Sequence, residues 1–136
     1  MQRTARLIYL DSSALVKLVI NERESADLAA YLAAAPMRAS CSLARVEVTR
    51  TAKLHGEGAV SRASVILLGT HLIGLDDDVL SVAADLASAS LRTLDAIHVA
   101  AAVSLRDQVS ALVTYDRRMA QAATSLGFVV ESPGTT

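Results

Sequence analysis

The sequence predicts an α/β fold, specifically a three-layer sandwich in which helices cover both faces of a parallel β-sheet. Short apolar runs typical of buried strands alternate with helical patterns along the 136-residue chain. No internal repeat, low-complexity segment or interdomain linker interrupts this alternation. The length suits one domain with a sizeable core, so we expect a single domain over residues 1–136.

The first half of the chain supplies three of the expected strands. Its first apolar run ends at Leu10, and Asp11-Ser12-Ser13 then combines a turn with residues that cap helices. Ser42 is a plausible cap for a helix that runs through Leu54. In order, the expected elements are a strand over 6–10, helices over 14–20 and 24–35, a strand over 37–41, helices over 42–54 and 59–69, and a strand over 71–75.

The second half begins with Asp76-Asp77-Asp78, three acids that favour the N-terminal dipole of a helix over 79–88. Thr93 can cap a helix that reaches about Leu105, and Gly127 can stop a helix over 117–126. Two further strands are expected over 111–114 and 128–130. Residues 131–136 are expected to form a flexible tail.

Composition excludes several protein classes. Hydrophobic residues make up 52% of the chain but aromatic residues only 3%, so Ala, Val, Leu and Ile must build the core. The single cysteine, Cys41, excludes an internal disulfide and fits a reducing cytoplasm, where we expect the protein to act. No apolar run approaches the roughly 20 residues of a membrane span. A net charge of −1 gives no global nucleic-acid signature.

Four acidic residues stand among apolar neighbours rather than in polar runs: Asp11, Glu47, Asp95 and Asp116. A carboxylate near a core is costly unless a positive group satisfies it. Asp11 and Asp116 each follow an expected strand, at the sheet edge where ligands of open α/β folds bind. Convergence of the four would therefore indicate a divalent cation, Mg²⁺ or Mn²⁺, held by oxygen ligands. The pattern alone leaves open the alternative of four unrelated helix caps and salt-bridge partners.

Four segments then make the chain resemble PIN-domain ribonucleases, specifically the VapC-type toxins of bacterial toxin–antitoxin pairs. They are LDSSALVKL at 10–18, SLARVE at 42–47, LRTLDAIHVAAA at 91–102, and LVTYDRRM at 112–119 followed by LGF at 126–128. Each segment is weak alone, but the four occur in the family's order and span nearly the whole chain. The departures are mild: a few residues precede the first strand, and Ser12 stands where Thr is common.

The resemblance implies a PIN-like fold with a five-stranded parallel sheet in the order 3-2-1-4-5. It also implies that the family's acidic cluster corresponds to Asp11, Glu47, Asp95 and Asp116, as catalytic residues and metal ligands. The small hydroxyl after the first aspartate corresponds to Ser13, as a catalytic residue that hydrogen-bonds a metal-bound water or a phosphate oxygen, or else merely caps the first helix. The expected reaction is hydrolysis of RNA phosphodiester bonds by metal-activated water.

Two groups of residues beside the acids raise separate questions. No strong histidine or lysine base is expected there, so an aspartate or a metal-bound hydroxide is the expected base. For His98, three residues after Asp95, a packed and hydrogen-bonded role is favoured over a metal or general-base role.

Arginine supplies 11 of the 13 basic residues. Arg45, Arg92 and Arg117, near the acids in sequence, are the expected RNA contacts, with ordinary surface arginines as the alternative.

The resemblance further implies an RNA substrate, a homodimer, and a cognate antitoxin that wraps the toxin and inserts an arginine or other side chain into the acidic site. The competing class is a catalytically inactive PIN-like scaffold that binds RNA or protein. Retention of all four acids argues against that class, since a degenerate site usually loses one. The RNA target, the number of metal ions and the identity of the antitoxin do not follow from the sequence.

Overall fold

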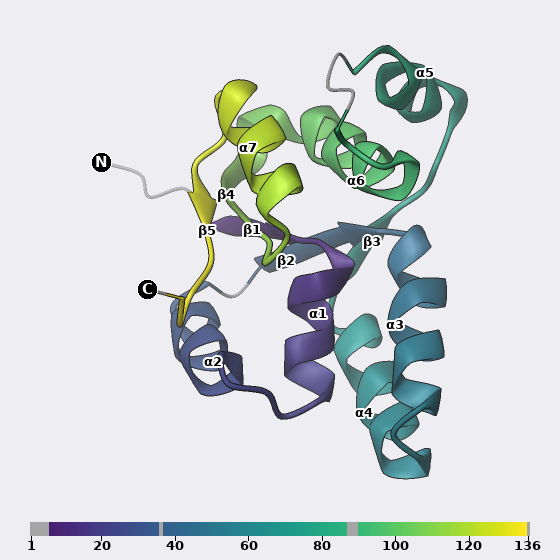
Figure 1. Ribbon diagram of the computed structural model, residues 1–136, viewed down its shortest axis with the longest axis vertical. Helices are drawn as coiled ribbons and strands as arrows, with labels where there is room; N and C mark the ends of the chain where they lie inside the picture. The colour runs from purple at the N-terminus through teal and green to yellow at the C-terminus, as the bar shows by residue number, and fades with distance from the viewer. Residues whose placement is uncertain (1–5, 36, 87–89, 136) are drawn as a thin grey trace.

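A five-stranded parallel sheet forms the middle layer of the computed structural model, which describes residues 6–35, 37–86 and 90–135 (Figure 1). The strands are Leu7–Leu10 (β1), Met37–Cys41 (β2), His71–Ile73 (β3), Val109–Val113 (β4) and Val130–Glu131 (β5). Their order is β3-β2-β1-β4-β5, and each neighbouring pair is parallel. The three-layer α/β class and the strand order expected from the sequence are confirmed.

Two groups of helices cover the two faces of this sheet (Figure 1). One face carries Ser12–Val19 (α1), Ser25–Ala33 (α2), Leu43–Lys53 (α3) and Glu57–Leu68 (α4). The other carries Asp77–Asp85 (α5), Thr93–Ser104 (α6) and Arg117–Ser125 (α7). A short 3₁₀ helix, Arg106–Gln108 (η1), precedes β4. In the part of the chain that the structure describes, no helix is long and apolar enough to cross a membrane.

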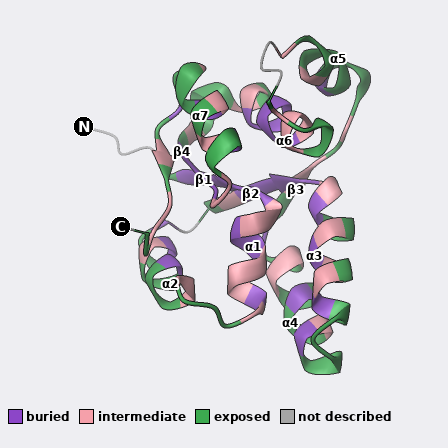
Figure 2. Cartoon of the chain, viewed as in Figure 1, coloured by how far each residue is buried: buried purple, intermediate pink, exposed green. Residues whose placement is uncertain are grey.

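The central strand β1 is buried along its whole length because it faces a core on each side (Figure 2). Successive side chains of a strand point to opposite faces of the sheet. Ile8 and Leu10 accordingly pack with the helices α1 to α4, whereas Leu7 and Tyr9 pack with α5 to α7. This is why the first apolar run has no polar alternation: a strand covered on both faces needs apolar residues at every position.

The order of the strands places a ligand-binding edge between β1 and β4. The chain leaves β1 toward β2 on one side and enters β5 from β4 on the other, so the strand order reverses between the two central strands. Leu10 and Val113 are paired at the carboxyl ends of these strands. Asp11 and Asp116 follow directly, at the position where open α/β sheets bind their ligands.

Several boundaries differ from the sequence-based expectation for local reasons. The last strand was expected at 128–130 but is Val130–Glu131. Gly127, with φ of +93°, turns the chain at the end of α7, and the backbone N–H of Phe128 still donates to the carbonyl of Ala123. Phe128 is buried in the core as part of this turn rather than as part of a strand. The expected helix over 79–88 ends at Asp85, and residues 87 and 88 lie outside the described residues.

Residues 131–135, which were expected to form a flexible tail, contact the rest of the domain in this structure. Glu131 belongs to β5, and Ser132 Oγ donates to the carbonyl of Thr114 at 2.5 Å. The hydroxyl of Tyr115 donates to the carbonyl of Pro133 at 2.7 Å. These two hydrogen bonds join the C-terminal segment to the loop after β4. Thr136, the last residue of the expected tail, lies outside the described residues.

Candidate functional site

Asp11 sits where β1 ends and α1 begins, and its carboxylate ties several elements together. Oδ1 accepts the backbone N–H of Ala14 at 3.0 Å, which caps α1, and the hydroxyl of Ser13 at 2.6 Å. Oδ2 accepts the hydroxyl of Thr114 at 2.5 Å. The side chain is almost fully buried. Burial raises the pKa of Asp11, and the hydrogen bonds from Ser13 and Thr114 only partly offset that rise.

The loops after β1 and β4 are joined by two hydroxyls. Thr114 Oγ1, besides donating to Asp11, accepts the backbone N–H of Asp116 at 3.1 Å. Ser13 Oγ accepts the backbone N–H of Tyr115 at 3.0 Å. Asp116 in turn caps α7, since its Oδ1 accepts the N–H of Met119 at 3.0 Å. Asp11 and Asp116 thus each cap a helix. The hydroxyls of Thr114 and Ser13 link the two loops that carry these caps.

Glu47 lies on α3 and is fixed by two partners through a single oxygen. Its Oε1 accepts the hydroxyl of Ser12 at 2.5 Å and pairs with His98 Nε2 at 2.9 Å. On the other side of the imidazole, Nδ1 lies 2.9 Å from the hydroxyl of Tyr9. Cys41 Sγ lies 3.6 Å from the same nitrogen. The favoured interpretation of His98, a packed and hydrogen-bonded residue, agrees with this geometry.

The charge of the His98 pair follows from these contacts. Burial lowers the pKa of His98, but hydrogen bonds with Cys41 and Glu47 outweigh burial and raise it to about 10. Burial raises the pKa of Glu47, yet the hydrogen bonds from His98 and Ser12 bring it below its ordinary value. His98 is therefore protonated near neutral pH. His98 lies beside Glu47 but already holds its proton, so it does not offer the histidine base whose absence was expected.

Asp95 lies in the first turn of α6, half-buried and without a hydrogen bond to its carboxylate from any described residue. Burial raises the pKa of Asp95, and the negative charges of Asp116, Asp11 and Glu47 raise it further, against a smaller lowering by His98. Asp95 is therefore within electrostatic range of the other three carboxylates. No described ion pair joins it to a cation.

This edge fits a divalent cation in its donor chemistry, because carboxylate oxygens are the ligands that Mg²⁺ and Mn²⁺ prefer. The side chains do not form a ready ligand shell: across residues 6–35, 37–86 and 90–135, no three His, Cys, Asp or Glu side chains are grouped closely enough to hold a metal ion. Asp11 and Glu47 already accept hydrogen bonds from protein groups. Asp95 is consequently the most available ligand of the set.

The expected RNA-contacting arginines divide into two places. A hollow of about 320 Å³ lies at the start of α7, lined by Arg92, Tyr115, Asp116, Arg117 and Arg118. Arg92 and Arg117 thus share a hollow with one of the four acids. Arg45 instead lines a separate groove between α3 and α4. No described ion pair joins these arginines to the acidic residues.

Sequence reasoning missed three contributors to this site: Ser12, Thr114 and Arg118. Ser12 and Thr114 each stand next to a loop acid or a strand end, where a hydroxyl can reach a carboxylate, and that placement was the available signal. Lys17 is removed from consideration as a base, since its ammonium pairs with Glu24 at 3.0 Å and lies 4.7 Å from the centre of the Tyr115 ring.

Comparison with known proteins finds a family model and two relatives that match most of the chain. The PIN domain family model matches residues 8–124. Ribonuclease VapC46 of Mycobacterium tuberculosis (strain H37Rv) is 45% identical over 126 residues, which cover 93% of this chain and 97% of that protein. Ribonuclease VapC47 of Mycobacterium tuberculosis (strain CDC 1551) is 39% identical over 133 residues, covering 94% and 98%.

Two solved structures share the fold. A chain of a toxin–antitoxin complex from Klebsiella pneumoniae aligns with a TM-score of 0.66 at 24% identity, over 80% of this chain and 86% of that one. Mycobacterium tuberculosis VapC20, described as a toxin that cleaves the sarcin–ricin loop, aligns with a TM-score of 0.68 at 18% identity, over 93% and 99%. At these identities the likeness shows the fold alone.

Proposed function

The chain belongs to the PIN-domain family, and from that premise we propose that it is a Mg²⁺- or Mn²⁺-dependent endoribonuclease, the toxin of a toxin–antitoxin pair. Its relatives at 39–45% identity bear the name ribonuclease VapC. The observation that carries the proposal is Asp95, a half-buried carboxylate whose pKa three other carboxylates raise and which belongs to no described ion pair. Like charges held together in this way favour a bound divalent ion.

In this proposal Asp11, Glu47, Asp95 and Asp116 would hold the ion. When bound, the ion supplies charge neutralisation and polarises water and phosphate oxygens. The protein's own contribution is positional. Ser13 and Thr114 fix the orientation of Asp11, and His98 with Ser12 fixes that of Glu47.

Asp95 is the residue suited to accept the proton of the attacking water. Burial and the neighbouring carboxylates raise its pKa in the metal-free protein, and burial likewise raises that of Asp11. Unlike those of Asp11, the oxygens of Asp95 are not engaged by described hydrogen-bond donors. We therefore propose Asp95 as the general base, where the sequence left an aspartate or a metal-bound hydroxide open.

The proposed partners follow from the family. The complex from Klebsiella pneumoniae that shares this fold is a toxin–antitoxin complex. We propose that this chain likewise has a cognate antitoxin protein, that it acts on RNA in the cytoplasm, and that it functions as a homodimer. Ser13 touches Asp11 and the backbone of Tyr115, so we assign it to holding the two loops together rather than to capping α1.

The test is RNA cleavage by the purified protein with Mg²⁺ or Mn²⁺, with excess EDTA, and with Asp95→Asn. We expect cleavage that needs the ion and that falls at least about 100-fold in the variant. Sequencing RNA 5′ ends after induced expression would locate the target. Cleavage that continues in EDTA would exclude the metal mechanism. RNA binding without cleavage by the wild type would favour the inactive scaffold.

A further inference from the structure

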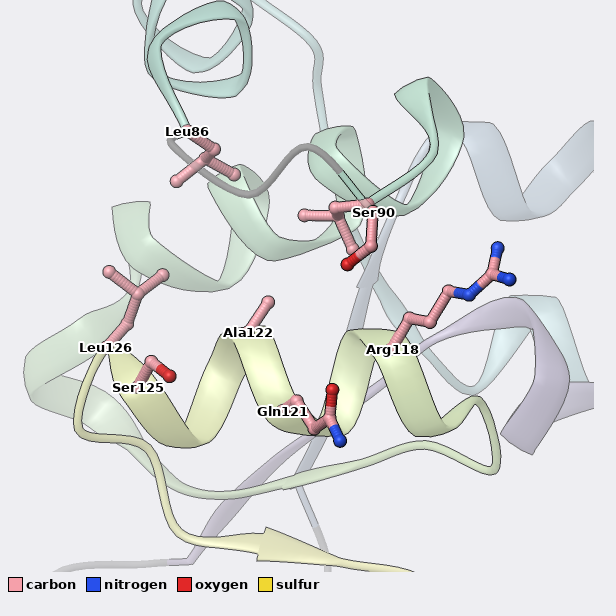
Figure 3. Close-up of a pocket in the computed structure, with 8 residues that line it drawn as sticks. Leu86, Ser90, Arg118, Gln121, Ala122, Ser125 and Leu126 are labelled. Carbon is pink, nitrogen blue, oxygen red and sulfur yellow. The ribbon is translucent and has the colours of Figure 1, made fainter.

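A second hollow lies between α7 and the described residues Leu86, Ser90 and Leu91 (Figure 3). Its volume is about 390 Å³. The described residues that line it are Leu86, Ser90, Leu91, Arg118, Gln121, Ala122, Ser125 and Leu126. The leucines and Ala122 make apolar walls, while Arg118, Gln121 and Ser125 supply polar groups. Figure 3 shows Ala122 pointing from α7 toward the side that carries Leu86 and Ser90.

One side chain borders both this hollow and the candidate active site. Arg118 lines both the second hollow and the first one, which contains Asp116. Along α7, Ala122 lies six residues beyond Asp116, which corresponds to about 9 Å of helix. A chain whose phosphate sits beside Asp116 can therefore place a neighbouring group in the second hollow.

We propose that this hollow is a subsite for an unstacked nucleobase of the RNA, one next to the cleaved phosphate. The inference rests on the proposed function and adds the chemistry of the substrate that the site selects. Single-stranded RNA is read by splaying bases out, packing them against apolar side chains or Arg guanidinium planes, and hydrogen-bonding their edges. Leu86, Leu91 and Ala122 can pack a base, and Arg118 can stack on it or hold the adjoining phosphate.

Gln121 gives the subsite its capacity to choose between bases. Its amide carries one acceptor and two donors, which suits a bidentate contact with a base edge. The mostly apolar lining with a few polar groups is also the usual character of a small-molecule pocket. The exposed Arg92 and Arg117 beside Asp116 can contact the phosphates on either side of the base.

The test separates base binding from phosphate binding. Asp95→Asn protein, which should bind without cutting, is titrated with four short single-stranded RNAs of equal length that differ in one base. We expect unequal affinities. Adding Ala122→Trp, which fills the hollow, should weaken binding about tenfold and remove the differences, with an unchanged salt slope. Gln121→Leu should remove the differences with a smaller loss. Ala30→Trp, at an exposed position on α2, is the matched control and should change neither.

Cleavage by otherwise wild-type protein distinguishes this inference from the proposed function. Failure of the wild type to cleave RNA would count against the proposed function. Normal wild-type cleavage, with Ala122→Trp and Gln121→Leu cutting the same positions at the same KM, would overturn the subsite alone. A change of oligomeric state in Ala122→Trp without any change in RNA binding would also overturn it and assign the hollow to an interface between copies of the chain.

Discussion

At the residue scale, the four carboxylates differ sharply in what else they do. Asp11 caps α1 and joins the loops after β1 and β4 through Thr114. Glu47 forms an ion pair with a buried histidine. Asp95 makes no such contact among the described residues. A carboxylate therefore contributes differently to the stability of the fold at each position. Substitutions at the four positions should accordingly differ in how much stability they remove along with activity.

Asp95→Asn should leave the metal-free protein as stable as the wild type or more stable. A carboxyl whose pKa is raised by folding destabilises the fold once it ionises, so the cost grows as pH rises from about 4. The melting temperature of the variant in EDTA should accordingly match the wild type near pH 4 and exceed it at pH 7. Asp78→Asn, at the exposed start of α5, is the control. A variant that melts well below the wild type at pH 7 would make Asp95 structural.

His98→Gln should destabilise the protein in a pH-dependent manner. The pKa of His98 rises from 6.5 to about 10 on folding, so its stabilisation is complete below pH 6.5 and disappears as pH rises through 10. We expect a loss of about 2 kcal/mol at pH 6, below that of a fully buried pair because Glu47 is only half-buried. Urea unfolding at pH 6 and above pH 10 measures it, with the exposed His55→Gln as control. An equal loss at both pH values would show that packing alone explains the effect.

At the element scale, regular elements were predictable where local patterns decide them. The strand Met37–Cys41 has the expected bounds, and the three acids at 76–78 open α5 as expected, with Asp76 accepting the N–H of Val79 as its cap. The cap of α6 was misplaced by one residue: Thr93 is the first helical residue and Arg92 takes the cap position. The bounds of the last strand and the placement of residues 131–135 depend on contacts with Ala123, Thr114 and Tyr115. No local sequence pattern indicates these contacts.

The placement of two of the acids was also predictable. The sequence places Asp11 and Asp116 after strands and at helix starts, which suffices to bring them to one edge of the sheet. The contact of His98 with Glu47 joins residues 51 positions apart on different helices, so only the packing of α6 against the sheet creates it. The sequence also did not show that Arg45 lines a different surface from Glu47. The two are two positions apart on α3, and residues at that spacing point in widely different directions from a helix.

The arginines at the starts of α6 and α7 should contribute to RNA binding, and Arg45 should contribute less. Arg92→Ala and Arg117→Ala, in the Asp95→Asn background, should each weaken binding and flatten the slope of log K against log salt by about one unit. The measurement is RNA affinity at several salt concentrations. Arg45→Ala, from the groove between α3 and α4, is the comparison. An equal flattening by Arg45→Ala would extend the RNA path across α3.

At the scale of the whole molecule, two cores share one sheet, and the carboxyl edge of that sheet is built with an electrostatic strain that a cation would relieve. The net charge of −1 supplies no global field that would draw RNA to the protein, so the proposed RNA binding would have to rely on local arginines. The first argument predicts that the stability of the protein depends on small cations. The second predicts that RNA binding depends on local arginines and on salt concentration more than on the net charge of the protein.

Mg²⁺ should raise the melting temperature of the wild type and not that of Asp95→Asn. A ligand that binds only the folded state stabilises it, by about 1.4 kcal/mol for each tenfold excess over its Kd. Thermal melts across a Mg²⁺ titration, reversed by EDTA, provide the measurement. The same rise in both proteins would indicate ion binding elsewhere, and no rise in either would contradict a metal site at this edge.

The two structural roles of Asp11, as a helix cap and as the partner of Thr114, have a consequence for how the protein could lose the proposed toxicity. If cells are selected for survival of induced expression, any substitution that silences the site is an escape allele. Changes at Asp11 also remove the cap of α1 and the partner of Thr114, so many of those alleles should yield chains that proteases clear. Alleles that yield abundant, folded but inactive protein should concentrate at Asp95, because a substitution there removes no described contact.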